Sequence, residues 1–354
     1  MQLQDRSCDP KRILLILHGS IGDVTRALPL ATVLRKAFPR SYIAWSVEPA
    51  SRPLLEHNPA IDQIILFDRL RGWRALAPFL RQIREKHFDL VLDLQRILKS
   101  GLISWMSGAP RRIGFNRADA KELNWLFNNL HIGAFDETIP KIEHYFKFTD
   151  YLGLQPETPQ WDFCLSAEER AAVENHIFSI KRSFAVLFVG TRWQSKRWFA
   201  SQIARCADLL HDPYSLDVVF LGGESDRQLA AEAIKETKTV VTNLVGRTSL
   251  REAIGIIERA KLAIGPDTGL MHIAAAVGTP VISLWGATRP QRTGPYGYSD
   301  LVIQGRAPCV PCNRKRCPIG RICMQSITTA EISERIAVAL RRDKANLISN
   351  VDAI

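Results

Sequence analysis

The sequence predicts an α/β protein with two domains, each built on a parallel sheet. The chain has 354 residues, more than one ordinary domain requires. Short apolar runs of strand length alternate with stretches of helical spacing, which is the order typical of parallel sheets. Residues 153–165 contain two prolines and have the composition of a linker between the two alternating regions.

Composition narrows the class of protein. With 46% hydrophobic and 23% charged residues, the chain is typical of a globular protein. Its formal net charge of +11 favours an anionic partner, namely nucleic acid, an anionic membrane surface or a phosphorylated substrate. The basic excess is spread over both halves, which disfavours a nucleic-acid-binding arm. No apolar run approaches the roughly 20 residues that cross a bilayer, and residues 1–11 lack the apolar core of a signal peptide. We therefore expect a cytoplasmic protein whose seven cysteines are reduced.

The first half begins with a strand over residues 13–17 and a helix over 24–38. The turn between them carries Ser20, Gly22 and Asp23, so Asp23 lies at the helix start. Asp is also a favoured helix cap, and the local sequence alone favours that role for Asp23. The remaining strands are predicted over 41–47, 61–67 and 89–94, with helices over 53–57, 74–86, 95–106 and 144–152.

Two basic elements of this half have more than one interpretation. The helix over 74–86 has a basic face beside an apolar one, which suits an anionic membrane or a charged acceptor, although a solvated helix covering a core is commoner. Arg111 and Arg112 begin a strand or turn over 110–115. Their guanidinium groups could contact acidic sugars or phosphates, or they could be surface charges.

The second half repeats the alternation. A strand over 183–189 leads into a polar loop with Thr191 and Lys196, and a helix follows over 200–210. A strand over 216–221 is followed by Glu224, whose carboxylate could accept hydrogen bonds from ribose hydroxyls, with Asp226 as the alternative. A strand over 240–246 and a helix over 249–260 come next, and a helix over 328–342 lies near the end.

The stretch over 261–288 predicts one βαβ unit. Strands over 261–264 and 281–285 flank a helix, and Asp267, Thr268 and Gly269 lie where the first strand ends and the helix begins. A helix start offers unpaired N–H groups and a positive dipole end, so this turn could bind a phosphate or diphosphate. Alternatively, Asp267 could only cap the helix.

Three motifs carry a family resemblance. Residues 243–250, the Asp-Thr-Gly-Leu-Met-His segment over 267–272 and residues 280–288 closely resemble the donor-binding half of the lipopolysaccharide heptosyltransferases, glycosyltransferase family nine. The Ser-x-Gly-Asp turn ending at Asp23 is similar to the family's first motif. The resemblance implies the GT-B fold, in which two Rossmann-like domains face each other across a cleft. It also implies transfer of heptose from ADP-heptose, with inversion, to the inner core of lipopolysaccharide.

The resemblance also implies roles for particular residues. Asp23 would be the catalytic base. Lys196 would neutralise the donor diphosphate, with Arg192 and Arg197 as rivals. The other expected donor contacts are Thr191, Glu224, Asp267, Thr268, Gly269 and His272, and the expected acceptor contacts are Ser20, Gly22, Arg111 and Arg112. No cofactor or divalent metal is implied, because protein cations and a helix dipole do the electrostatic work.

We predict an acceptor-binding domain over 1–165, a donor-binding domain over 166–327, and a helix and tail over 328–354 that could pack back on the first domain. The expected partners are the nucleotide-sugar donor, a lipid-linked oligosaccharide acceptor and, peripherally, the anionic inner membrane surface, but not nucleic acid. Another nucleotide sugar or a protein acceptor is the alternative. Four cysteines could bind a metal ion, remain reduced thiols or form an adventitious disulfide: Cys309, Cys312, Cys317 and Cys323.

Overall fold

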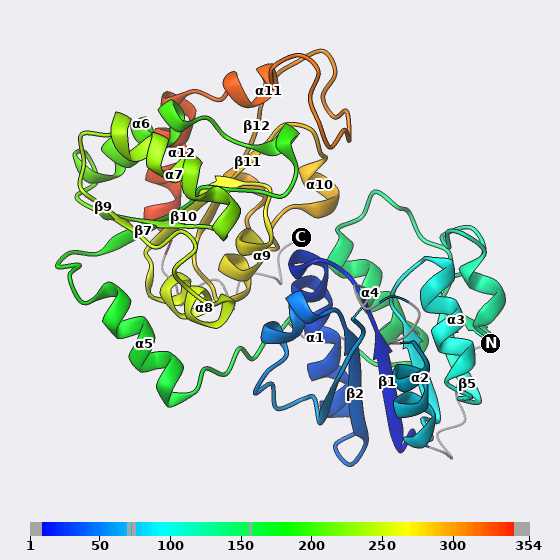
Figure 1. Ribbon diagram of the computed structural model, residues 1–354. Coiled ribbons are helices and arrows are strands. Elements are labelled where there is room, and N and C mark those ends of the chain that lie inside the picture. The colour runs from blue at the N-terminus through cyan, green and yellow to red at the C-terminus, as the bar shows by residue number, and fades with distance from the viewer. Residues whose placement is uncertain (1–8, 69–71, 73–75, 156–157, 343–354) are drawn as a thin grey trace. The chain divides into compact units, whose positions relative to one another are not determined.

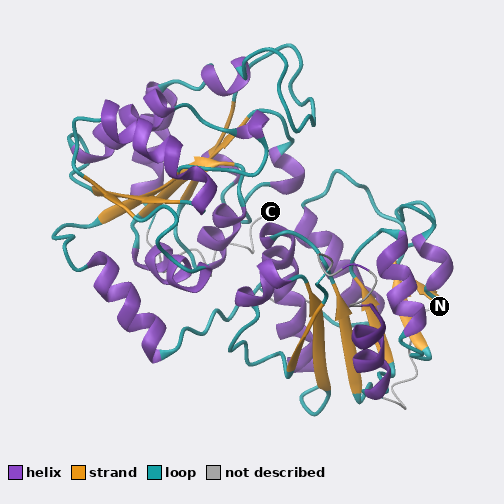
Figure 2. Cartoon of the chain, viewed as in Figure 1, coloured by secondary structure: helices purple, strands orange, loops and turns teal. Residues whose placement is uncertain are grey.

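The computed structural model describes residues 9–68, 72, 76–155 and 158–342. The chain divides into two compact units, residues 1–164 and 165–354. Each unit is an α/β layer structure with its own parallel sheet, and Figure 2 shows helices packed around the strands of both. The predicted α/β class and the GT-B pair of Rossmann-like units are confirmed.

The first unit contains a six-stranded sheet in the order β3-β2-β1-β4-β5-β6, with all strands parallel. In Figure 1 its chain runs from blue to green. The strands are β1 Arg12–Ile16, β2 Tyr42–Val47, β3 Gln63–Leu66, β4 Leu90–Asp93, β5 Arg111–Gly114 and β6 Leu130–His131. The helices are α1 Ile21–Ala37, η1 Pro49–Leu54, α2 Leu76–Glu85, α3 Leu98–Met106, η3 Asn124–Phe127 and α4 Lys141–Tyr151.

The second unit repeats this topology in the order β12-β11-β10-β7-β8-β9. Its strands are β7 Phe184–Phe188, β8 Asp217–Leu221, β9 Val241–Asn243, β10 Leu262–Pro266, β11 Val281–Trp285 and β12 Val302–Gln304. Its α-helices are α5 Ala167–Ile177, α6 Ala200–His211, α7 Arg227–Glu236, α8 Leu250–Arg259, α9 Gly269–Ala276, α10 Pro290–Thr293, α11 Ile322–Gln325 and α12 Thr329–Leu340. Short 3-10 helices are η4 Gln194–Lys196, η5 Glu224–Asp226 and η6 Ser299–Leu301.

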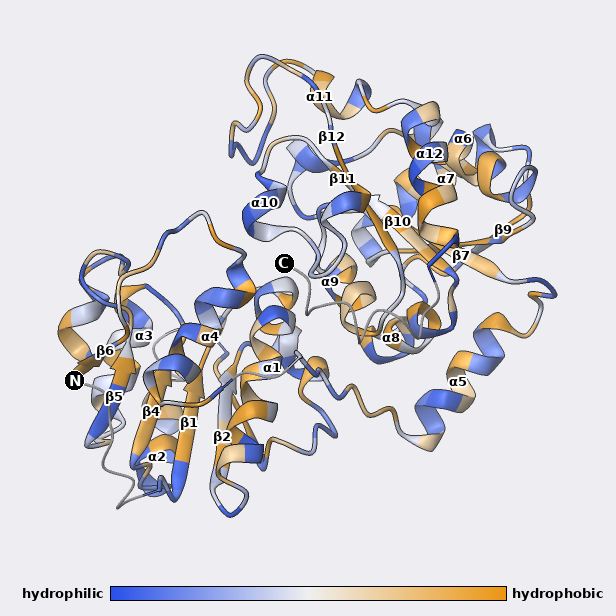
Figure 3. Ribbon diagram, turned by 180° about the vertical axis from the view of Figure 1, so that it is seen from behind, coloured by the Kyte–Doolittle hydropathy of each residue, from blue (hydrophilic) through white to orange (hydrophobic). Residues whose placement is uncertain are grey.

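The central strands form the core of each unit. Every residue of β7, β10 and β11 is buried, and Figure 3 shows the strands in the hydrophobic colour while hydrophilic residues lie mainly on helices and loops. Strands covered on both faces have continuous apolar sequences. This is why they could be predicted from the sequence. Each fully buried Leu or Ile side chain stabilises the fold by about 1.5–3 kcal/mol.

Both sheets reverse strand order at one point. The first strand of each unit, β1 or β7, lies beside the fourth, β4 or β10. Ligands of open α/β sheets bind outside the carboxyl ends of the strands at such a switch point. The turns after β1, β7 and β10 carry Asp23, Lys196 and Asp267. The topology therefore places the predicted motifs where a doubly wound sheet binds its ligand.

The segment predicted as a linker ends where the two units divide, and part of it is bound to the first unit. The indole N–H of Trp161 donates to the carbonyl of Thr25 at 2.7 Å, and the amide of Asn58 donates to the carbonyl of Trp161 at 3.1 Å. Thr32 adds a hydrogen bond to the carboxylate of Asp162 at 3.1 Å. Proline content alone could not distinguish this strap from a free linker, since its partners lie more than 100 residues away.

The sequence missed elements at the sheet edges. Strands β6 and β12 have two and three residues, too short for a recognisable alternation. Helices α5 and α7 were also not predicted. Helix α12 packs on α6 and β11 within the second unit. The tail over residues 343–354 lies outside the described residues.

Candidate active site

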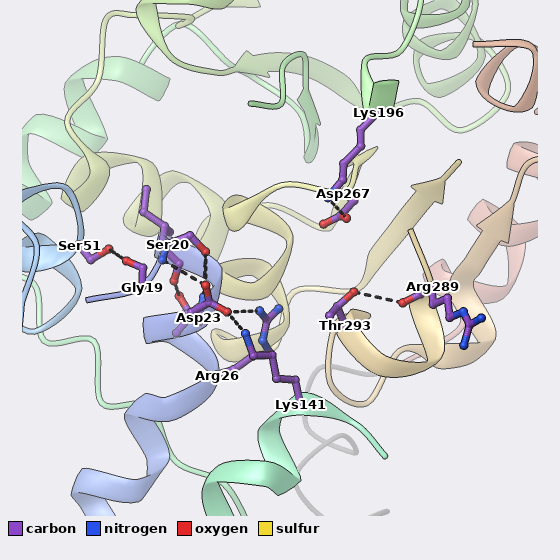
Figure 4. Close-up of polar contacts among 12 residues, drawn as sticks. Gly19, Ser20, Asp23, Arg26, Ser51, Lys141, Lys196, Asp267, Arg289 and Thr293 are labelled. Carbon is purple, nitrogen blue, oxygen red and sulfur yellow. Dashed lines mark hydrogen bonds and ion pairs between the residues drawn. The ribbon is translucent and has the colours of Figure 1, made fainter. Parts of the chain in front are cut away.

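Asp23 lies at the third position of α1, where the chain leaves β1. Its Oδ2 accepts hydrogen bonds from the backbone N–H and the hydroxyl of Ser20, at 3.2 and 2.8 Å. The Ser20 hydroxyl in turn accepts from the backbone N–H of Asp23, so the two residues form a capping box. Asp23 does cap its helix, as its local sequence allows, and Figure 4 shows that its other oxygen has further partners.

Two cations meet the other carboxylate oxygen. Arg26 donates to Oδ1 of Asp23 at 2.9 Å, and Lys141, the first residue of α4, forms an ion pair with the same oxygen. Burial by itself would raise the pKa of Asp23, but the charges of Lys141 and Arg26 and the hydrogen bonds from Lys141 and Ser20 bring that pKa below its ordinary value. The Asp23 side chain is 22% exposed, so it remains accessible. The carboxylate is therefore ionised across the physiological pH range.

Gly19 leaves the space that Asp23 occupies. A Cβ at position 19 would lie 2.7 Å from the Cβ of Asp23, closer than real Cβ contacts. The hydroxyl of Ser51 in η1 donates to the carbonyl of Gly19 at 3.2 Å and fixes this turn from the other side. Gly22 is buried in the first turn of α1 and brings no side chain to the site.

A second carboxylate, Asp93, lies at the carboxyl end of β4 but is fully buried. It accepts from the amides of Asn124 and Asn128, at 2.7 and 3.1 Å. Burial raises the pKa of Asp93 to about 6, and the hydrogen bonds from Asn124 and Asn128 oppose that rise. With 0% exposure it cannot reach a substrate, so Asp23 is the accessible carboxylate at this switch point.

Arg111 and Arg112 do not lie with Asp23. They begin β5, pairing with Leu90 and Val91 at the start of β4, so they stand at the amino end of the sheet. Arg111 pairs with Asp89, and Arg112 donates to the carbonyls of Phe127 and Ala109 at 3.1 and 2.6 Å. These contacts favour a structural role for both residues, and contact with an acceptor stays a prediction. The motif that suggested them does not reveal which end of the strand a side chain occupies.

In the second unit, Asp267 binds three side chains, and two of them, Lys196 and Thr191, were predicted site residues. Its Oδ2 receives the ammonium of Lys196 at 2.5 Å and the hydroxyl of Thr288 at 2.8 Å, and its carbonyl accepts from the hydroxyl of Thr191 at 2.7 Å. Figure 4 shows Lys196 extended toward this carboxylate. The side chains of Lys196 and Asp267 are only 14% and 13% exposed. Asp267 thus connects the turns after β7, β10 and β11.

The start of α9 fits an anion. Thr268 is the N-cap, and no side chain caps this helix. In contrast, α1, α5, α8 and α12 begin with a Ser or Thr capping box. The first N–H groups of α9, from Gly269 on, can therefore hydrogen-bond to a phosphate oxygen, and the helix dipole adds a favourable field. Asp267 does not cap α9, and its alternative interpretation as a simple cap is wrong. His272 lies one turn into α9 and is 5% exposed.

Lys196 is the cation that belongs to this cluster. Its ammonium also lies 4.3 Å from the ring centroid of Trp193, which restricts its position. Of its two rivals, Arg192 is exposed, and Arg197 directs its Nε to the carbonyl of Thr191 at 3.5 Å. The geometry favours Lys196 for a diphosphate.

The cysteine-rich loop, residues 309–323, supports the turn that carries Lys196. The sequence did not suggest this function. The hydroxyl of Ser195 donates to the carbonyl of Arg314 at 2.5 Å, and its N–H donates to the carbonyl of Lys315 at 3.2 Å. The guanidinium of Arg321 donates to the carbonyl of Arg197 at 3.0 Å. Residues 313–321 therefore hold both ends of the short helix η4 that carries Lys196.

The four cysteines of this loop are free thiols. Burial raises the pKa of Cys323, and the neighbouring thiols of Cys317, Cys309 and Cys312 add to that rise. Among the described residues, no group of three or more His, Cys, Asp or Glu side chains is arranged to hold a metal ion.

Two carboxylates follow β8, and they differ in exposure. Glu224 is 72% exposed at its side chain and pairs with Arg227 at 2.8 Å. Asp226 is buried, accepts from the N–H of Gly223 at 3.0 Å, and fills the space left by Gly190, where a Cβ would lie 1.9 Å from its Cγ. Asp226 is committed to the turn, so Glu224 is the carboxylate available to a ribose.

The features at the two switch points indicate the class of protein. One switch point carries an ionised carboxylate, and the other carries a lysine beside a helix start that no side chain caps. The paired Rossmann-like units have the GT-B fold of glycosyltransferases that use nucleotide sugars. Residues 76–323 match glycosyltransferase family 9 (heptosyltransferase), and the chain belongs to this family.

Relatives and solved structures agree with that assignment. The lipopolysaccharide core heptosyltransferase OpsX of Haemophilus influenzae is 27% identical over 83% of this chain and 84% of its own. Lipopolysaccharide heptosyltransferase 1 of Pseudomonas aeruginosa is 28% identical over 86% and 87%. The family 9 transferase of Veillonella parvula has a TM-score of 0.79 at 22% identity, covering 94% of this chain and 98% of its own. ADP-heptose lps heptosyltransferase II of E. coli has a TM-score of 0.73 at 24% identity, covering 93% and 98%.

Lys141, Arg26 and Thr288 are the site residues that the sequence analysis missed. Lys141 lies 118 positions from Asp23, so only the fold pairs them. The sequence did contain one indication that Lys141 has a partner. A cation at the first position of a helix is unfavourable beside the positive end of the helix dipole, so an interaction elsewhere must offset that cost.

Proposed function

We propose that this protein transfers heptose from ADP-heptose to the inner core of lipopolysaccharide, inverting the anomeric centre. Membership of family 9 and the names of the relatives support the reaction class. The geometric observation that supports the proposal most is the ion pair between Asp267 and Lys196, which lies beside the uncapped start of α9. Such a site complements the diphosphate of a nucleotide sugar.

In the proposed reaction, Asp23 is the general base. The acceptor hydroxyl oxygen attacks the anomeric carbon as its proton passes to the Asp23 carboxylate, and the bond to the diphosphate breaks with its electron pair leaving on ADP. The reaction requires the acceptor hydroxyl to reach both Asp23 and the bound donor. An ionised carboxylate that is 22% exposed meets the requirements for a base.

The second unit stabilises the departing diphosphate in this scheme. The ammonium of Lys196 and the N–H groups that follow Thr268 neutralise the charge that develops on the leaving group, without reorganising during the reaction. Thr191 and Thr288 hold the turn through Asp267. Glu224 accepts hydrogen bonds from the ribose, and Gly269 allows close approach of the diphosphate. His272, one turn into α9, orients the donor together with Asp267.

The test is the variant Asp23→Asn, assayed with ADP-heptose and truncated lipopolysaccharide acceptors by mass spectrometry of the products. We expect turnover to fall at least 10³-fold, because an amide cannot take the proton, while ADP binding by calorimetry stays within twofold. Glu143→Gln in the exposed first turn of α4 is the control. Turnover within tenfold of wild type would reject Asp23 as base. Transfer from another nucleotide sugar in preference to ADP-heptose would support the alternative donor.

We also propose that the protein contacts the anionic inner face of the inner membrane peripherally, where a lipid-linked acceptor is presented. The formal net charge of +11 supports this attraction. Within the described part of the chain, none of the helices combines the length and apolarity needed to span a bilayer.

A further inference from the structure

All four lone-pair positions of the Asp23 carboxylate are occupied. Oδ2 accepts from the N–H and hydroxyl of Ser20, and Oδ1 accepts from Arg26 and Lys141. A carboxylate in this state cannot receive a proton from a substrate hydroxyl until one donor withdraws. Figure 4 shows these donors around the carboxylate.

Lys141 is the donor that can withdraw. Ser20 is the N-cap of α1 and Arg26 lies within the helix, each three residues from Asp23, so the start of the helix holds both donors near the carboxylate. Lys141 comes from a different helix, on a flexible four-carbon stem whose side chain is 27% exposed. Its position at the start of α4 is electrostatically unfavourable for a cation, and the ion pair with Asp23 offsets that cost.

We propose that Lys141 is a positioning residue for the catalytic base: it keeps Asp23 ionised and oriented, and its ammonium leaves Oδ1 when the acceptor hydroxyl binds. This inference rests on the proposed role of Asp23. The pair lies within one unit, on helices that pack together. The proton still passes to Asp23, and Lys141 keeps its own proton throughout.

Few other charges act on the carboxylate. From its own helix the charged group is Arg26, and from α4 it is Lys141. The 3-10 helix η1, which also packs on α1, contributes the neutral hydroxyl of Ser51, while its cation Arg52 pairs with Glu56 at 2.9 Å. Among the described residues, Lys141 is therefore the charged group that acts on the base from outside α1, so its replacement changes the charge facing the base without changing the turn that holds it.

The experiment is a graded series at one position: Lys141→Arg, Lys141→Met and Lys141→Glu. Activity requires ionised Asp23, so it is lost as pH falls through the pKa of that carboxyl. Arginine keeps the charge, methionine removes it, and glutamate adds a repelling carboxylate, so we expect the acid limb of kcat/KM to move to higher pH in that order. Loss of one close opposite charge shifts a carboxyl pKa by about one to three units.

A matched control and two readouts separate the outcomes. Lys147→Met removes an exposed charge from the same helix, where Lys147 pairs with Asp150, and should leave the pH profile unchanged. ADP affinity should stay within twofold in the whole series. An acid limb that is identical in the Met and Glu variants and the wild type overturns the role of Lys141, even where Asp23→Asn is inactive. Full turnover by Asp23→Asn overturns Asp23 as the base and with it the role of Lys141, whereas a wild-type protein that transfers no heptose from ADP-heptose overturns the proposed function itself.

Discussion

At the scale of single residues, two glycines leave the space that two carboxylates of the site regions occupy. Asp23 occupies space that a Cβ at position 19 would take, since the two Cβ atoms would lie 2.7 Å apart. Asp226 likewise fills the space beside Gly190. At both positions the glycine has no Cβ, and an aspartate side chain occupies the space that a Cβ would need. Glycine is needed here for close approach rather than for an unusual backbone angle.

Gly19→Ala should therefore damage catalysis while leaving the donor site intact. The new methyl group displaces Asp23 by several tenths of an ångström or more, and misplacement of a reacting group by about 1 Å costs up to 10²-fold in rate. We expect kcat to fall about 10- to 100-fold with ADP affinity unchanged, measured by steady-state kinetics and calorimetry. Gly133→Ala is the control, because no atom lies within 4 Å of its added Cβ. Equal kcat values for the two variants would contradict the packing argument.

At the scale of elements, the cysteine-rich loop supports the turn that carries Lys196, the residue proposed to bind the diphosphate. It reaches η4 through Arg314, Lys315 and Arg321, and the guanidinium of Arg321 also lies 4.2 Å from the ring centroid of Phe199. Its cysteines drew attention in the sequence, but its contacts to η4 are made by backbone carbonyls, the guanidinium of Arg321 and the backbone N–H of Cys317, which donates to Gln194 at 2.9 Å. This loop thus supports the donor site without contributing to it directly.

Arg321→Met tests this support. The variant keeps the aliphatic contact and loses the hydrogen bond to the carbonyl of Arg197, so the Lys196 turn becomes less restrained. We expect ADP affinity to fall about fivefold, corresponding to roughly 1 kcal/mol for one hydrogen bond. Arg316→Met removes the same charge from an exposed position of the same loop and controls for long-range electrostatics. A matching loss of affinity in both variants would show that charge, and not support, is responsible.

At the scale of the whole molecule, the net charge of +11 bears on where the protein works. We expect it to sediment with vesicles that contain phosphatidylglycerol and not with purely phosphatidylcholine vesicles. Attraction between separated surface charges is screened at high ionic strength, so binding should weaken from 50 mM to 500 mM salt. Absence of binding to anionic vesicles at low salt would refute the proposed membrane contact.

The sequence by itself determined the fold class and most of the elements near the switch points. Strands such as β7 and β11 are buried on both faces, so their sequences are continuous apolar runs. Helix α9 is itself a segment rich in small residues between two such strands. It also indicated Asp23, Lys196 and Asp267, because turns after parallel strands meet at one edge of a sheet.

Only the tertiary structure decided which partners these residues have. Lys141 reaches Asp23 across 118 positions, and Arg321 reaches Arg197 across 124, distances in sequence that no local pattern records. The structure also placed Arg111 and Arg112 at the amino end of β5, bound segment 158–162 to the first unit and separated Glu224 from Asp226 by exposure. The physical reason is common to these cases: periodicity reports which face of an element is buried, whereas hydrogen bonds and ion pairs depend on which elements the fold brings together.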